Sequence, residues 1–141
     1  GDYSIKGYED QICFEHKSIA DLVGTCGYAN RDRFRKELQR MKDGFAFYCI
    51  VISGKESDIK PHCEKLYTTQ YKQFMAKKRR GFKGRPPMRP ECRVPSVIGS
   101  LRAFRADFNC HYYYLDDKPT TSDWIQEQCE VFMRHKYEPI S

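Results

Sequence analysis

Apolar and polar positions in this chain follow the two-residue period of strands in some segments and the helical period in others. Residues 2–6 and 11–17 are predicted to form the two strands of a hairpin, with Gly7-Tyr8-Glu9-Asp10 as its turn. Residues 45–53 are apolar throughout, which predicts a strand that helices cover on both faces. A further strand is predicted at 110–115.

Helical periodicity accounts for most of the remaining chain. Ser18 followed by Asp21 fits a capping box, which predicts a short helix over 18–23 that Gly24 and Gly27 end. Asn30 predicts the start of a second helix, which continues to about residue 42. Further helices are predicted from residue 57 or 58 to 78 with an interruption or kink at Pro61, from a cap at Ser96 to about 109, and from Thr120 onward.

The resulting order of elements, β-β-α-α-β-α-α-β-α, predicts an α/β fold with a central mixed sheet flanked by helices. The 141 residues suffice for a real core, and we interpret 1–141 as a single domain. No segment approaches the roughly 18 consecutive apolar residues of a membrane span, and no signal-peptide pattern opens the chain. No membrane partner is therefore expected.

Positive charge is concentrated in one stretch rich in glycine and proline. Residues 77–93 carry a net charge of +7, whereas the whole chain carries +6. The glycines and prolines predict a basic loop at about 79–95, and such dense like charge favours a phosphate-rich partner such as DNA. The predicted DNA-binding residues are Lys77, Lys78, Arg79, Arg80, Lys83, Arg85, Arg89 and Arg93. Phe82 among them could stack on a base, although a soluble tether is the alternative interpretation.

The helix after Asn30 offers a second basic surface. Its apolar stripe consists of Phe34, Leu38 and Met41. The other face carries the cations Arg31, Arg33, Arg35, Lys36, Arg40 and Lys42. Such a face can bind nucleic acid or can simply be a solvated helix surface, and the sequence favours neither.

Seven cysteines are scattered along the chain without a Cys-x-x-Cys motif. An odd and scattered set argues against a disulfide framework and for reduced thiols, as in the cytoplasm of a bacterial or phage-infected cell, or in a eukaryotic nucleus. A zinc site from His62, Cys63, Cys92, Cys110 and His111 is the alternative, but their spacing fits no standard zinc motif.

The candidate chemistry lies at the end of the strand over 11–17. Side chains alternate along a strand, so Glu15 and Lys17 are predicted on one face and His16 on the other. A carboxylate beside an ammonium group can hold a divalent metal and stabilise a developing negative charge. Alone, such a pair more often marks a solvated strand face.

The surrounding motif makes this pair more specific. Gly1-Asp2-Tyr3, a hairpin, then Glu15-His16-Lys17 and Asp21 resemble the Gly-Asp…Glu-x-Lys-x-x-x-Asp signature of the XPF-type nuclease domain in the PD-(D/E)XK superfamily. The resemblance extends through 22–24, the helix after Asn30, and the segments 45–53 and 95–101, but leaves out roughly 60–94. It is closest to a stand-alone version of the phage or bacterial kind.

The resemblance implies a restriction-endonuclease-like fold and a magnesium-dependent endonuclease acting on branched, flap or single-strand/duplex junction DNA, as in repair or recombination. Matched to the family motif, Asp2, Glu15, Lys17 and Asp21 would be the catalytic residues. Asp2, Glu15 and the carbonyl of His16 would hold Mg²⁺, for which Mn²⁺ can substitute, and Lys17 would position or activate the attacking water. Pairing within the family also implies a possible homodimer.

Three features depart from the family pattern. No earlier strand with a further acidic residue precedes Gly1, and His16 replaces the usual arginine. Tandem helix-hairpin-helix modules are absent, so the basic loop would take their place. The alternative function is a catalytically inactive DNA-binding or protein-interaction module with the same fold.

Overall fold

A four-stranded mixed sheet forms the centre of the computed structural model, which describes residues 3–9, 11–44, 47–115 and 118–137. The strands lie in the order β1 (Tyr3–Ser4), β2 (Ile12–Ser18), β3 (Phe47–Ser53) and β4 (His111–Leu115). β1 is antiparallel to β2, whereas β2, β3 and β4 run parallel. The predicted hairpin and the predicted mixed sheet are therefore confirmed.

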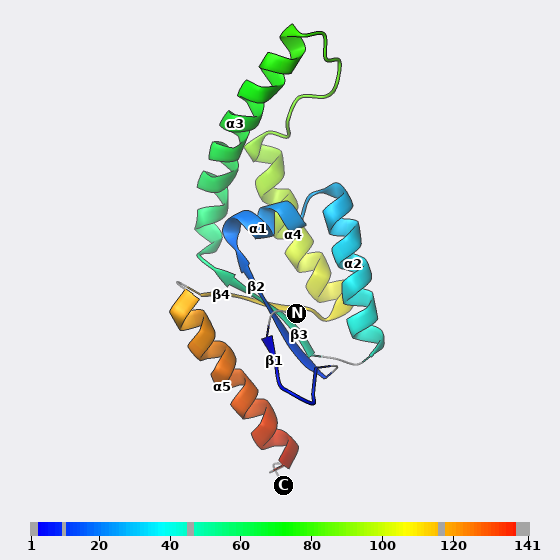
Figure 1. The fold of residues 1–141 in the computed structure, drawn as a ribbon, viewed down its shortest axis with the longest axis vertical. Coiled ribbons are helices and arrows are strands. Elements are labelled where there is room, and N and C mark those ends of the chain that lie inside the picture. Colours follow the sequence, from blue (N-terminus) through cyan, green and yellow to red (C-terminus); the bar gives the residue numbers. More distant parts are fainter. Residues whose placement is uncertain (1–2, 10, 45–46, 116–117, 138–141) are drawn as a thin grey trace.

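Helices occupy both faces of this sheet, as predicted (Figure 1). They are α1 (Ile19–Thr25), α2 (Tyr28–Asp43), α3 (Ile59–Arg79), α4 (Pro90–Phe108) and α5 (Lys118–Tyr137), with a turn of 3-10 helix, η1 (Glu56–Asp58), before α3. The first four helices pack on one face and α5 on the other. None of the helices in the described ranges is long and apolar enough to cross a lipid bilayer.

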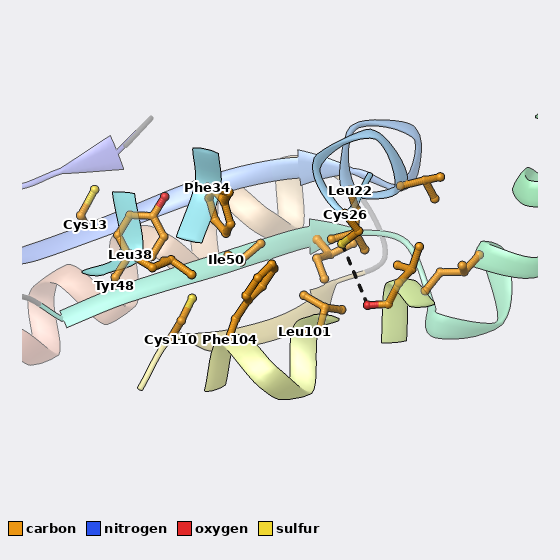
Figure 2. Close-up of a cluster of buried hydrophobic side chains, with 14 of the residues drawn as sticks. Cys13, Leu22, Cys26, Phe34, Leu38, Tyr48, Ile50, Leu101, Phe104 and Cys110 are labelled. Atoms are coloured by element: carbon orange, nitrogen blue, oxygen red, sulfur yellow. Dashed lines mark hydrogen bonds between the residues drawn. The ribbon is translucent and has the colours of Figure 1, made fainter. Parts of the chain in front are cut away.

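The alternation of side chains along β3 divides the core into two clusters. Tyr48, Ile50 and Ile52 pack under α1 to α4, together with Phe34 and Leu38 of α2 and residues of α4 (Figure 2). Cys49 and Val51 point to the opposite face and pack with residues of α5. All five of these β3 side chains are at most 3% exposed. Burial on both faces explains why this strand is apolar throughout.

Helix α2 begins three residues earlier than predicted. Gly27, in an extended conformation, occupies the N-cap position, so the prediction of Asn30 as the cap is wrong. The Asn30 side chain instead donates a hydrogen bond of 3.1 Å to the carbonyl of Gly24. That carbonyl lies near the end of α1, which continues through Gly24 to Thr25. Asn30 thus ties the two helices together at their junction.

Helix α4 also begins earlier than predicted, at Pro90, so the prediction that Ser96 caps it is wrong. Proline is favoured at a first helical position because its missing N–H has no helical partner there. The second proline, Pro95, lies inside the helix. The predicted end of the helix is confirmed at Asn109, which caps it in a left-handed conformation. Because α3 reaches Arg79 and α4 starts at Pro90, the basic loop shortens to 80–89.

Two further predictions, for the third and the last helix, differ from the structure. Pro61 lies in the first turn of α3, where backbone N–H groups have no partner within the helix, so the helix runs uninterrupted through it. The last helix starts at Lys118 and not at Thr120. The predicted apolar residues of that helix are confirmed, since Ile125 is buried and Phe132 packs against the same cluster.

The far half of α3 and the loop that follows extend away from the sheet (Figure 1). We call residues 71–89 the basic arm. At the base of α3, Ile59 and Cys63 are at most 1% exposed, whereas Tyr71 and Phe82 in the arm are 43% and 48% exposed. With 21 residues, α3 is about 30 Å long at 1.5 Å per residue. The tip of the arm is therefore remote from the sheet.

All seven cysteines are free thiols, and five of them are buried in the core. Burial raises the pKa of the Cys49 and Cys110 thiols to about 12. Nowhere in the described ranges do three His, Cys, Asp or Glu side chains gather as a metal-binding cluster. The five buried cysteines therefore behave as small apolar core residues. The zinc alternative gains no support.

The packing of α2 on β3 predicts the cost of removing its central leucine. Leu38 is 1% exposed, so we expect Leu38→Ala to lower the free energy of unfolding by about 2–5 kcal/mol through lost burial and a residual cavity. Lys36→Ala, at an exposed position two residues earlier, should change it by less than about 0.5 kcal/mol. Urea denaturation of both variants measures the difference, and equal effects would contradict this account of the core.

Candidate active site

Glu15 and Lys17 project from the same side of β2, as the alternation predicts. The Nζ atom of Lys17 lies 3.1 Å from Oε1 of Glu15 and donates a hydrogen bond to it. His16 points to the opposite face of the sheet, where its Nε2 hydrogen-bonds with the hydroxyl of Ser53 on β3. Only the backbone of His16, and not its side chain, can therefore contact a ligand beside Glu15.

The ion pair is enclosed by the helices over the sheet. Lys17 is only 9% exposed, and its Nζ lies 5.3 Å from the centre of the Phe34 ring on α2. Ammonium groups are attracted to the face of an aromatic ring, most strongly where water is excluded. A solvated strand face would leave both charges in water, so that interpretation of the Glu-x-Lys pair does not hold here.

The second oxygen of Glu15 has its own partner on the neighbouring strand. The hydroxyl of Tyr48 donates a hydrogen bond to Oε2 of Glu15. In the parallel pairing of β2 with β3, Tyr48 is opposite Cys13 and Ile50 is opposite Glu15, which places Tyr48 on the same face as the carboxylate. Lys17 and Tyr48 therefore hold the Glu15 carboxylate from two directions.

Burial raises the pKa of Tyr48 far above its ordinary value, and the hydrogen bond and negative charge of Glu15 raise it further. The Tyr48 phenol therefore stays protonated above the pH at which an exposed tyrosine ionises, and it donates its hydrogen bond to Glu15.

Helix α1 starts directly after the Glu-His-Lys triplet because Ser18 caps it. The hydroxyl of Ser18 accepts a hydrogen bond of 3.1 Å from the backbone N–H of Asp21, which confirms the predicted cap. Asp21 itself is exposed in the first turn, where a carboxylate is stabilised by the helix dipole. A carboxylate at this position therefore stabilises the start of α1.

The other predicted acid, Asp2, lies outside the described residues. Tyr3, which follows it in the chain, is opposite Phe14, the residue before Glu15. A divalent-metal ligand set therefore cannot be assembled from the described part of the chain, in which no three acidic, histidine or cysteine side chains cluster.

The donor chemistry of Glu15 nevertheless fits a hard cation. A carboxylate offers about four lone-pair positions, so bonds from Lys17 and Tyr48 leave capacity for a metal ion. Mg²⁺ prefers oxygen ligands and is commonly held by one or two carboxylates together with water and substrate phosphates. One oriented carboxylate at a half-buried position meets that requirement.

The eight predicted DNA-binding cations are not brought to Glu15. All lie on or beside the basic arm, from Lys77 at the end of α3 to Arg93 in the first turn of α4. Phe82 contacts Phe74 edge-on with ring centres 6.4 Å apart, and Lys77 lies 5.8 Å from the Phe82 ring centre. Phe82 keeps about half of its surface exposed and remains available for stacking.

Sequence reasoning did not identify Tyr48 and Phe34 as part of the site. Both were interpreted only as apolar residues of a strand and of a helix stripe. Their contacts with Glu15 and Lys17 depend on the register between β2 and β3 and on the placement of α2. Neither arrangement leaves a local signal in the sequence.

The environment of Tyr48 predicts how stability responds to alkaline pH. An unfolded chain ionises this phenol near 10.0, whereas the folded protein keeps it protonated to a higher pH. The unfolded state therefore loses a proton that the folded state retains, and the free energy of unfolding falls as pH rises above 10. We expect wild type to lose about 1 kcal/mol more than Tyr48→Phe between pH 10 and 11.

Urea denaturation across this pH range provides the measurement. Tyr71→Phe is the matched control, because Tyr71 is 43% exposed and its variant should follow the wild-type curve. Parallel curves for wild type and Tyr48→Phe would show that the buried phenol is absent or ionises normally.

Comparison with known proteins bears on this site. Residues 1–127 match the family model of the ERCC4 domain. The matched range contains the Glu15-His16-Lys17 triplet and Asp21. No curated protein and no solved structure matches the chain. The match confirms the resemblance to XPF-type nucleases of the PD-(D/E)XK-like class, a family of nucleases that act on DNA. The chain therefore belongs to the ERCC4 domain family.

Proposed function

We propose that this protein is a metal-dependent DNA endonuclease that hydrolyses phosphodiester bonds at branched, flap or junction structures. The observation that carries this proposal is the enclosed Glu15–Lys17 pair, whose carboxylate is oriented from both sides by Lys17 and Tyr48. A charged pair withdrawn from water is retained only where close partners compensate for the lost hydration. Partly buried charged groups with specific partners are common at functional sites.

Glu15 is the proposed ligand for Mg²⁺, together with Asp2 and the backbone carbonyl of His16. When bound, the ion supplies Lewis-acid stabilisation of the negative charge that develops on the phosphate, and Mn²⁺ can replace it. Lys17 and Tyr48 hold Glu15 in one orientation before the ion arrives. That preorganisation lowers the reorganisation required for binding.

Lys17 is the proposed cation for the attacking water and the scissile phosphate. Its ammonium group is enclosed beside Phe34, and electrostatic interactions strengthen where water is excluded. A positive charge fixed there can orient a water molecule through hydrogen bonds and stabilise negative charge on phosphate oxygens. Asp21 would act from the start of α1, and its exposed position suits an outer contact to water or metal.

The basic arm is the proposed contact for DNA away from the point of cleavage. Its cations extend from a helix about 30 Å long, so one duplex touching both the arm and Glu15 would span several base pairs. A branched or junction DNA could also present a separate segment to each of the two surfaces. The arm is therefore proposed to anchor one segment of the substrate while another lies at Glu15.

An inactive DNA-binding or protein-interaction module is the alternative function. It would retain the basic arm, but it would have no need for a carboxylate oriented by two buried partners. The possible homodimer stays a prediction.

Removal of the Glu15 carboxylate tests the chemistry. We expect Glu15→Ala to reduce magnesium-dependent cleavage of flap and splayed-arm DNA at least about a hundredfold, because a metal ligand is lost. DNA affinity should persist or rise, since a carboxylate that repels phosphate is gone. Glu127→Ala, at an exposed position on α5, is the matched control and should cleave like wild type. Gel assays of cleavage and of binding in EDTA measure the two effects separately.

Wild-type protein that binds these DNAs but never cleaves them with Mg²⁺ or Mn²⁺ would favour the inactive module. Cleavage that survives in Glu15→Ala would instead refute the assignment of Glu15.

The arm is tested through the salt dependence of binding. If it neutralises about five phosphates of duplex DNA, log K should fall with log salt at a slope near −4.5. Replacing Arg79, Arg80, Lys83 and Arg85 by Ala should flatten that slope by roughly three to four. Arg102→Ala with Arg105→Ala, two exposed cations of α4, serves as the control. An unchanged slope in the arm variant would move the duplex contact elsewhere.

A further inference from the structure

Two adjoining hollows lie where α4 packs beside α1 and α2. The first, of about 230 Å³, is floored by apolar side chains such as Val23 and Val97 and flanked by Arg31 and Arg93. The second, of about 440 Å³, continues between the same helices past Arg35. Arg31 and Ser96 line both hollows, so the two hollows adjoin at these residues. We call the two hollows together the α2–α4 groove.

Positive charge predominates along this groove. Arg31 on α2 and Arg93 on α4 come from different helices, and no carboxylate in the described part of the chain lies within ion-pair distance of either. The nearest polar partner of Arg93 is Gln70, at 3.5 Å. Arg35 is paired with Asp107 at 3.1 Å. Asp32 is the single acidic side chain among the described residues that line the groove.

Two guanidinium groups without a carboxylate partner, both lining one groove, favour an anionic occupant. Their planar forks match the geometry of phosphate oxygens and can bind them through two parallel hydrogen bonds. A groove that runs on past the first pair of arginines suits a chain of phosphates better than a single ion. The chemistry on both walls therefore fits a phosphodiester backbone.

The groove is physically connected to the candidate active site through Phe34. Arg31 and Phe34 lie one turn apart on α2, and the Phe34 ring contacts both Lys17 and Phe104 of the groove wall.

At its other end the groove reaches the root of the basic arm. Met88 and Arg93, which line it, flank the point at which the loop enters α4. The groove therefore lies between the two surfaces assigned to DNA above.

We propose that the α2–α4 groove binds the phosphodiester backbone of one substrate strand between the basic arm and the Glu15–Lys17 site, through Arg31 and Arg93. This inference rests on the proposed function. It adds a strand-binding site that neither the family motif nor the basic loop specifies.

The test compares charge-neutral variants inside and outside the groove. Arg31→Gln combined with Arg93→Gln should weaken binding of a fluorescein-labelled flap DNA about tenfold in EDTA and flatten the salt slope by about 1.4, the value for two single-strand phosphates. Arg33→Gln combined with Arg102→Gln, exposed cations on the same two helices, should change affinity less than about twofold. Arg31→Lys with Arg93→Lys should recover most of the slope, because charge is restored.

The outcomes separate the two proposals. If the arm variant loses affinity while the groove and control variants behave alike, the groove proposal is overturned and the proposed function stands. If wild type binds no flap, splayed-arm or single-stranded DNA, both fail. Polyglutamate and an unlabelled oligonucleotide are also compared as competitors of the labelled flap DNA at equal concentrations of negative charge. Equal competition by the two would assign the groove to an acidic peptide and overturn the phosphodiester assignment. Unchanged urea denaturation curves confirm that each variant is folded.

Discussion

The parallel pairing of β2 with β3 is the constraint on which the rest of the structure depends. Parallel neighbours cannot be joined by a tight turn, so the chain must cross over the sheet between them, and α1 and α2 make that crossing. The crossing starts at the Ser18 cap, directly after Lys17, and returns α2 over the same face. It thereby places Phe34 above Lys17, and the strand register places Tyr48 beside Glu15. One strand pairing and its crossover thus bring together the four side chains Glu15, Lys17, Phe34 and Tyr48.

The same arrangement explains how a charge pair is retained beneath helices. An ammonium group that is 9% exposed would be costly alone, because removal of an ion from water is repaid only by close partners. Here the carboxylate of Glu15 and the ring of Phe34 supply those partners, while Tyr48, Ile50 and Ile52 of β3 are almost fully buried on the same face of the sheet. Stability therefore comes from the two apolar clusters, and the polar pair is held by them. A site of this kind is oriented before any ligand binds.

The sequence was sufficient to predict the α/β class, the order of the elements and the common face of Glu15 and Lys17, because each follows from local periodicity. Boundaries failed where a tertiary contact overrode a local signal. Asn30 resembles a cap, but its amide reaches back to Gly24 of the preceding helix, and Ser96 resembles a cap although Pro90 starts the helix six residues earlier. Tyr48 and the α2–α4 groove could not be predicted at all. Both depend on which strands and helices become neighbours, and Asp2, the second acid of the motif, lies outside the described residues.

Charge is distributed in opposite senses at the two ends of the proposed DNA path. The basic arm holds seven of the eight cations predicted to bind DNA, with Arg93 at its root, whereas Glu15 contributes a negative charge where the phosphate would be cut. A carboxylate repels a phosphate, so affinity must come from cations placed elsewhere, and a metal ion must neutralise the repulsion locally. Remote anchoring and local neutralisation then become separate requirements. A DNA that satisfies only one of them could be bound without being cut, so selectivity for DNA structure would arise from the spacing between the two surfaces.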